Sequence, residues 1–162
     1  MPARAASRER FGCAPLRDTW PVRTHEQTAL SAIELTRGAF ASANSGDYDE
    51  MMRFYGPDSV WDVSPWGLGT HTGMTAIRQF FKDWIGGFDE YLVTVEQLHD
   101  LGNGVVYAIA VQQGRAAGSD GHLRLRYAPV FLWDGDIAIR VTHHRDIEQG
   151  RAAGERLAAS RG

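Results

Sequence analysis

The stretch SVWDVSPWGLGTHTGMTAIRQFF, residues 59–81, changes character twice and organises the chain around it. Its first part is a short run of strand-forming residues that carries one carboxylate, that of Asp62. A loop rich in proline, glycine, tryptophan and histidine follows, and a strongly apolar helix comes after the loop. We interpret these three parts as the mouth of a pocket, made of a strand, a rim loop and a helical wall.

Two helices are predicted upstream of this stretch. The capping-box spacing of Thr24 and Gln27, followed by periodic apolar residues, predicts a helix of about 20 residues that ends near Gly46. Asp47 is placed to cap a short second helix. A strand is then predicted over residues 60–64.

Long strands are predicted downstream. In the third helix, which begins near Thr72, apolar residues recur at spacings of three and four as far as Phe88. From Tyr91 the period changes to two, and three further long strands follow, with turns at 102–104 and 134–136. This order predicts an α+β fold in which a cone-shaped, curved antiparallel sheet is covered by three N-terminal-side helices. The interior of such a cone is a natural place for a ligand.

The periodic pattern is confined to the middle of the chain. Residues 1–22 lack periodicity and are rich in arginine and alanine, so we expect an N-terminal extension outside the domain, free to be flexible. We expect the cone domain to span residues 23–147. Residues 148–162 are predicted to form a weakly helical C-terminal tail with little to bury.

Composition limits the classes of partner. The 162 residues carry a net charge of −3 without a lysine or arginine run, so we expect no nucleic-acid or membrane partner. Cys13 is the only cysteine, which excludes an intrachain disulfide and favours a cytoplasmic location. The sequence has no short metal-ligand spacing, glycine-rich phosphate loop or nucleophile elbow, so we expect no metal and no cofactor.

Three stretches carry a resemblance to a known family: FASANSGDYDEMMRFYGPDSVWD (residues 40–62), GMTAIRQFF (73–81) and FLWDGDIAIRV (131–141). In this order they resemble the SnoaL-like branch of the nuclear transport factor 2-like superfamily. The resemblance implies the cone fold over about residues 25–147. That superfamily includes ketosteroid isomerase, scytalone dehydratase, limonene epoxide hydrolase and polyketide cyclases, but also members that only bind or assemble. The resemblance therefore implies a fold and leaves the function open.

Strand alternation indicates which polar side chains face the interior. Ile139, Val141 and His143 share a face, and this apolar company places the imidazole of His143 inside the cone. On the preceding strand, Tyr127 shares a face with Phe131 and is the one inward polar group.

The orientation of Asp62 stays open at this point. If Val60 and Ser64 point inward, so does Asp62. If Trp61 and Val63 point inward, Asp62 faces out. The resemblance leaves the same choice, because the aspartate base of ketosteroid isomerase falls on Asp62 or, when no gap is allowed, on Val63.

Other functional groups of these relatives are missing. The resemblance to limonene epoxide hydrolases places one aspartate of their water-activating set on His143, and the strand VVYAIAVQQ offers neither their arginine nor their second aspartate. Epoxide hydrolysis is therefore not expected. By the same resemblance, the oxyanion-hole residues of ketosteroid isomerase fall near Ala39 or Phe40 and near Pro129, none of which can donate a side-chain hydrogen bond. Tyr127 could donate in their place.

These considerations give a set of candidate residues. The proposed catalytic residues are Asp62, His143 and Tyr127, and the proposed substrate-binding residues are Tyr55, Trp66, His71, Trp84 and Phe131. An inward carboxylate would have a raised pKa and could act as a general base, with the imidazole as its acid/base partner.

Three functions fit these candidates. The first is a cofactor-independent acid/base enzyme of the isomerase, dehydratase or cyclase type, acting on a small, largely apolar substrate. The second is a non-catalytic small-molecule binding protein. The third is a dimerisation or assembly module. We also expect a homodimer through the open face of the sheet, because residues 105–111 are apolar on both faces of their strand.

Overall fold

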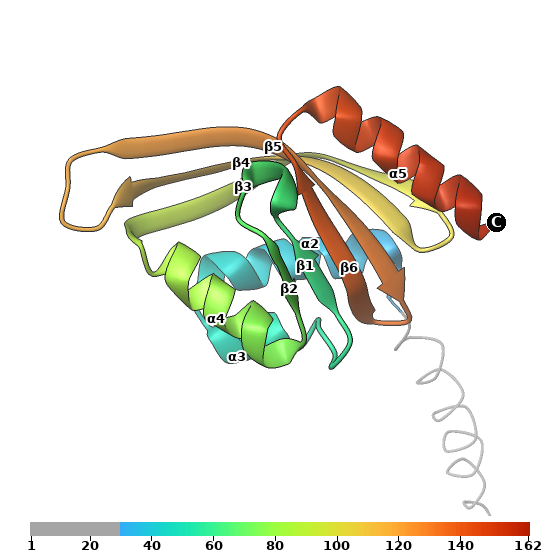
Figure 1. Cartoon of the computed structure of the whole chain (residues 1–162), viewed down its shortest axis with the longest axis horizontal. Coiled ribbons are helices and arrows are strands. Elements are labelled where there is room, and N and C mark those ends of the chain that lie inside the picture. The colour runs from blue at the N-terminus through green and yellow to red at the C-terminus, as the bar shows by residue number, and fades with distance from the viewer. Residues whose placement is uncertain (1–29) are drawn as a thin grey trace, which may run out of the picture. The chain divides into compact units, whose positions relative to one another are not determined.

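The computed structural model describes residues 30–162 (Figure 1). The expected extension over residues 1–22 and the capping box at Thr24 lie outside the described residues. Within this range no helix is long and apolar enough to cross a membrane.

The order of elements is the predicted one, two helices, a strand, a helix and then a run of long strands, with a 3-10 turn and a short strand added before the third helix. Their bounds are α2 (Ala32–Ser45), α3 (Tyr48–Met52), β1 (Val60–Asp62), the 3-10 turn η2 (Ser64–Trp66), β2 (Thr70–Thr72), α4 (Met74–Ile85), β3 (Phe88–Gly102), β4 (Val105–Ala116), β5 (His122–Asp134), β6 (Ile137–His144) and α5 (Ile147–Arg161). The predicted α+β class is confirmed. Strand β2 was not predicted, because its three residues, Thr-His-Thr, carry no apolar alternation.

The strands form one curved sheet in the order β2-β1-β6-β5-β4-β3. Strand β1 runs parallel to β6, and the other neighbours are antiparallel. The pairing of Trp61 with Val141 is decisive for the site. It places Trp61 on the same face of the sheet as Val141, and it places Asp62 with Thr142 on the other face.

Turn chemistry fixes the hairpin between β3 and β4. The residues Gly102, Asn103 and Gly104 all have positive φ angles, of 89°, 56° and 82°. A Cβ atom on Gly104 would lie 2.4 Å from the carbonyl oxygen of Trp133, so this position admits only glycine.

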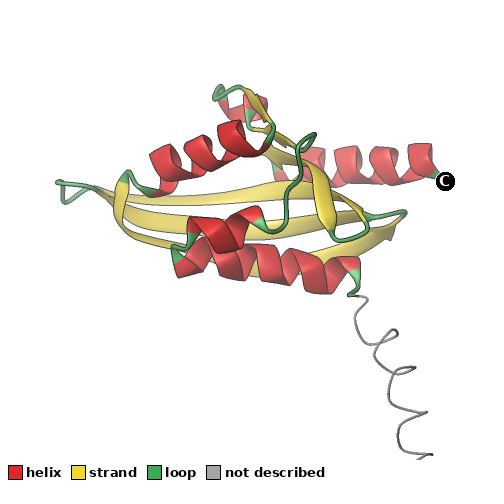
Figure 2. Cartoon of the chain, turned by 90° about the horizontal axis from the view of Figure 1, so that it is seen from below, coloured by secondary structure: helices red, strands yellow, loops and turns green. Residues whose placement is uncertain are grey.

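Helices α2, α3 and α4 cover the concave face of the sheet (Figures 1 and 2). Asp47 caps α3 as predicted, because its side chain accepts hydrogen bonds from the backbone of Asp49 and Glu50. Asn44, near the end of α2, exchanges two hydrogen bonds of 2.8 Å with the backbone of Val93 in β3. This pair of bonds fixes α2 against the last strand of the sheet.

Helix α5 covers the opposite face (Figure 1). It packs on an apolar cluster that includes Val105, Tyr107 and Val130. Two of its residues, Gly150 and Gly154, are buried because they bring the helix backbone close to the sheet. The tail is helical as predicted, but the expectation that it has little to bury is wrong. Its buried residues are Gly150, Gly154 and Ala158, which give little hydrophobic signal in a sequence.

Candidate functional site

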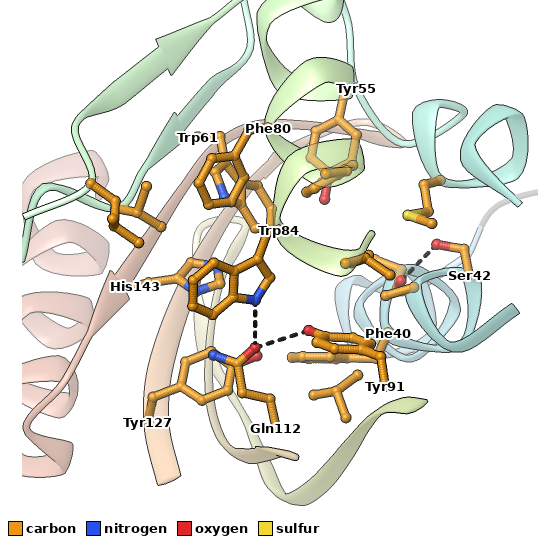
Figure 3. Close-up of a pocket in the computed structure, with 18 of the residues that line it drawn as sticks. Phe40, Ser42, Tyr55, Trp61, Phe80, Trp84, Tyr91, Gln112, Tyr127 and His143 are labelled. Atoms are coloured by element: carbon orange, nitrogen blue, oxygen red, sulfur yellow. Dashed lines mark hydrogen bonds between the residues drawn. The ribbon is translucent and has the colours of Figure 1, made fainter. Parts of the chain in front are cut away.

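A cavity of about 60 Å³ lies between the concave face of the sheet and helices α2 and α4. Ten of its twenty lining residues are phenylalanine, tyrosine or tryptophan (Figure 3). No aspartate, glutamate, lysine or arginine of the described range lines it. The cavity is therefore an aromatic space without an ionised wall residue.

Aromatic rings pack closely around this space, in edge-to-face, tilted and stacked arrangements. The ring of Trp61 lies 4.7 Å from that of Phe81 and 4.5 Å from the imidazole of His143, measured between ring centroids. The ring of Tyr127 stacks on the same imidazole at 5.1 Å. Such contacts hold each ring in one orientation, so the wall of the cavity is rigid where β1, β5 and β6 form it.

Gln112 supplies the best-defined polar group of the cavity (Figure 3). Its side-chain oxygen accepts hydrogen bonds of 3.0 Å from the indole N–H of Trp84 and from the hydroxyl of Tyr91. Because an indole N–H can only donate, the oxygen of Gln112 must face it, and the amide nitrogen faces the other way. Figure 3 shows the amide group of Gln112 beside Tyr127.

His143 lies inside the cavity, as its apolar neighbours predicted. Burial and, to a smaller extent, the nearby His144 lower its pKa to about 3, against an opposing effect of Asp62. The imidazole is therefore neutral at physiological pH. Within residues 30–162, its Nε2 is fully buried and has no hydrogen-bond partner.

The tyrosines of the cavity are also neutral. Burial raises the pKa of Tyr91 to about 12 and raises that of Tyr127 well above its usual value. Tyr127 lines the cavity as predicted (Figure 3). At neutral pH these phenols can donate hydrogen bonds but do not carry charge.

Asp62 does not line the cavity: of the two orientations that the sequence left open, the structure has the outward one, which removes this carboxylate from the proposed catalytic set. One of its oxygens accepts hydrogen bonds from the backbone N–H and hydroxyl of Ser64 and from the hydroxyl of Thr70. The other accepts a 2.7 Å hydrogen bond from Arg140. The carboxylate thus anchors the rim loop on the outer side of the sheet.

The pKa of Asp62 reflects this position. Desolvation raises it, but the hydrogen bonds from Ser64 and Thr70 and the charge of Arg140 together lower it more, so that the net pKa lies below the usual value. A carboxylate held in this way is ionised and already fully hydrogen-bonded. It is poorly suited to take a proton from a ligand in the cavity.

His71 also lies outside the cavity. Its ring rests on that of Phe80 at 4.8 Å, and its Nε2 lies 3.0 Å from the carbonyl oxygen of Leu68. It supports the rim loop from outside. The other expected binding residues do line the cavity: Tyr55, Trp66, Trp84 and Phe131.

Several lining residues were missed by the sequence reasoning, and Gln112 is the most important. It follows Val106, Ala108 and Ala110 at two-residue spacing, so alternation puts its polar side chain on an otherwise apolar face. That signal was present in the sequence. Within the described range, no cluster of side chains could hold a metal ion.

The profile of the SnoaL-like domain matches residues 36–154. The chain belongs to the SnoaL-like domain family. No curated protein sequence matches it.

Solved structures extend this likeness at the level of the fold. A protein of Catenulispora acidiphila with a ketosteroid isomerase-like fold, solved in complex with trimethylamine, shares 15% identity and a TM-score of 0.63, covering 75% of this chain and 92% of that one. TerC, co-crystallised with polyporic acid, shares 15% identity and a TM-score of 0.61, covering 75% and 95%. A proposed SnoaL-like polyketide cyclase of Shewanella denitrificans shares 16% identity and a TM-score of 0.63, covering 78% and 97%.

Proposed function

We propose that this SnoaL-like protein binds a small, uncharged, largely apolar molecule in the aromatic cavity. One observation carries the proposal: aromatic rings enclose the cavity, while Gln112, Tyr127 and His143 supply neutral polar groups. Pockets of this kind, mostly apolar with a few convergent polar atoms, are typical of small-molecule sites.

The cavity wall has no ionised side chain among the described residues, and this favours a neutral ligand. Burying an ion without a counter-ion costs much more than burying a neutral polar group that gains a hydrogen bond. The structures with trimethylamine and with polyporic acid support the binding of a small molecule, since each of those proteins holds one on the same fold. Aromatic faces could also attract an ammonium group. The N–H and O–H groups of this cavity, however, call for a ligand that accepts hydrogen bonds.

A second candidate function is acid/base catalysis of the isomerase, dehydratase or cyclase type. The observation in its favour is the unpartnered Nε2 of His143, next to the stacked phenol of Tyr127. A neutral imidazole can accept a proton, and a phenol can donate to a developing oxyanion. With a pKa of about 3, however, His143 is a weak base at neutral pH, and Asp62 does not assist it. Binding is therefore the better-supported function.

The proposal is tested by extracting the purified protein with solvent and identifying any bound compound by mass spectrometry. The control is Ala43→Leu, which adds a bulky side chain to the cavity wall. We expect a neutral compound bound near one molecule per chain in the wild type and strongly depleted in the variant. If no compound co-purifies and a panel of uncharged aromatic alcohols and ketones also fails to bind, the proposal is wrong.

The same material separates binding from catalysis. Each compound that binds is incubated with the wild type and with His143→Phe, and the mixture is analysed for product. An enzyme would convert the compound in the wild type and lose most turnover in the variant. A binding protein would return it unchanged from both.

The homodimer remains a prediction, and we propose a narrower interface for it. Helix α5 covers much of the apolar surface that motivated the dimer, including Val105 and Tyr107. A second copy would therefore bind the part of the sheet near Leu92, whose side chain is exposed. Sedimentation of the wild type and of Leu92→Glu tests this, since only a dimer through that surface would dissociate in the variant. The cytoplasmic location is likewise a prediction from the sequence.

A further inference from the structure

The cavity is smaller than the ligand class proposed for it. A cavity of about 150 Å³ is known to admit benzene, and typical ligand pockets reach about 300 Å³ or more. The present cavity has about 60 Å³, which is too small for an aromatic ring. Part of the wall must therefore move to make room for the ligand. This inference rests on the proposed function and makes it more specific.

Trp66 lines the cavity from the rim loop, at the end of the 3-10 turn η2. Its ring centroid lies 5.5 Å from that of Tyr127, 6.3 Å from that of His143 and 6.3 Å from that of Trp84. It therefore occupies the space above the polar groups of β5 and β6. An aromatic ligand in the same place would make the same edge-to-face contacts.

The indole N–H of Trp66 gains nothing from this position. It is fully buried and has no hydrogen-bond partner within residues 30–162. By contrast, the indole N–H of Trp84 binds Gln112, and that of Trp133 binds Thr36. The indole N–H of Trp61 also lacks a hydrogen-bond partner within residues 30–162, but Trp61 belongs to strand β1 and is fixed by the pairing with β6. A buried donor without a partner costs free energy, so the inward position of the Trp66 indole is energetically unfavourable.

The loop holds Trp66 by its backbone, and no hydrogen bond within residues 30–162 holds its side chain. Its backbone hydrogen bonds run within the loop: from Trp66 and Leu68 to Val63, from Gly67 to Ser64, and from Val63 to Gly69. Gly67 and Gly69 have φ angles of 76° and 82°, and no atom lies within 4 Å of a Cβ placed on either of them. The outer side of the loop is therefore open, and an outward rotation of the Trp66 side chain breaks none of these bonds, nor those from Ser64 to Asp62.

We infer that the indole of Trp66 occupies the ring subsite of the ligand and is displaced on binding by a flat, uncharged, bicyclic aromatic molecule that bears a hydroxyl or carbonyl oxygen. The size of the ligand ring follows from the indole that it replaces. The oxygen follows from the groups that the indole covers, because Tyr127 and the unpartnered Nε2 of His143 can both bind an oxygen. The absence of ionised residues from the wall sets the neutral charge.

Calorimetric titration with 2-naphthol tests the inference. The side chain of Trp66 competes with the ligand, so its removal raises the affinity. We expect Trp66→Ala to bind 2-naphthol about tenfold more tightly than the wild type. The matched control is Met74→Ala, at the exposed start of α4 and outside the cavity, and its affinity should equal that of the wild type. Naphthalene, which lacks the oxygen, should bind more weakly than 2-naphthol to every variant.

A second readout uses the intact side chain. In wild-type protein labelled with 5-fluorotryptophan, the ¹⁹F resonance of Trp66, assigned with Trp66→Phe, should shift on addition of 2-naphthol toward the value of a solvent-exposed tryptophan. This readout also decides the question if Trp66→Ala does not fold. If 2-naphthol binds without this shift, or binds Trp66→Ala no better than the wild type, Trp66 is a fixed wall and the inference is wrong.

Failure of this inference differs from failure of the proposed function. A compound that co-purifies with the wild type but is smaller than a bicyclic ring would leave the proposed function intact and refute the displacement of Trp66. Failure of 2-naphthol to bind any variant would refute the inference as well. The absence of both a co-purified compound and any binding from the wider panel would refute the proposed function itself.

Discussion

The two faces of the sheet are filled by different kinds of residue, and the difference separates stability from ligand binding. On the outer face, Gly150 and Gly154 bring α5 so close that a Cβ atom on Gly150 would lie 2.6 Å from the Cβ of Ala128. On the concave face, large rings meet edge to face and leave a cavity. Small residues allow close approach of backbones, whereas rings fixed at steep angles leave space between them. The outer face therefore has little tolerance for added volume, and the concave face has some.

The largest expected effect comes from Gly150→Val, which tests the close contact on the outer face. The added side chain would overlap Ala128, so we expect the free energy of unfolding to fall by about 3 kcal/mol. The matched control is Ala159→Val, at an exposed position of the same helix, which should cost about 0.5 kcal/mol. Urea unfolding measures both. Equal losses in the two variants would show that α5 does not pack tightly on the sheet.

A pH titration of stability tests the burial of His143 on the concave face. Its pKa is about 3 in the folded protein and about 6.5 in an unfolded chain. The unfolded state therefore binds the extra proton first, and stability is lost as the pH falls from about 6.5 toward 3. We expect the wild type to lose about 2 kcal/mol from this group between pH 7.5 and pH 5.

The variant His143→Phe isolates this contribution. The pKa of His144 is also lowered, by burial, but His144 is present in both proteins and cancels in the difference. Between pH 7.5 and pH 5, the free energy of unfolding of the variant should fall by about 2 kcal/mol less than that of the wild type, as measured with urea. Identical pH dependence in the two proteins would mean that His143 is solvated.

Asp62→Asn tests whether the carboxylate anchors the rim loop rather than serving the cavity. We expect a loss of about 1.5 kcal/mol at pH 7, because the charge-assisted bond to Arg140 is weakened. Since the folded pKa of Asp62 is lowered, this contribution is present above about pH 4 and is lost as the pH falls through the folded pKa. The exposed variant Asp58→Asn should change stability by less than about 0.5 kcal/mol. A loss that is independent of pH would contradict the role assigned to the charge.

The smallest effect is expected from Ala43→Leu, which adds volume on the concave side. Because Ala43 lines the cavity, we expect stability to stay within about 1 kcal/mol of the wild type or to rise slightly. Ala128→Leu adds the same volume beneath α5 and should be destabilised by about 2 kcal/mol. Thermal unfolding measures the stability of both variants. Equal losses would show that the two faces of the sheet do not differ in their tolerance for added volume.

The sequence predicted the fold better than the site, for physical reasons. Capping by Asp47, the glycine-rich turn at Gly104 and the change of period at Tyr91 are local signals, and the structure contains all three features. The orientation of Asp62 is not local. A strand of three residues is too short for alternation to define a buried face, and the parallel pairing with β6 decides it.

Site residues on long strands could be predicted from the sequence, whereas the position of His71 beside the rim loop could not. His143 and Tyr127 lie on long strands whose apolar neighbours identify the inner face, and both line the cavity. His71 sits next to the rim loop, where sequence proximity to the cavity does not mean contact with it. The packing of α5 could not be predicted from hydrophobicity, because its buried positions include Gly150, Gly154 and Ala158.

The pair of hydrogen bonds between Asn44 and Val93 has a consequence for how copies of this protein can meet. Strand β3 is the last strand of the sheet, so its outward backbone groups form an edge to which a strand from another molecule could add. At Val93 the amide of Asn44 satisfies both the N–H and the carbonyl, in the manner of one residue of a neighbouring strand. An incoming strand would have to displace that side chain before it could pair there. The side-chain amide of Asn44 thus hinders the addition of a strand to the sheet edge at Val93.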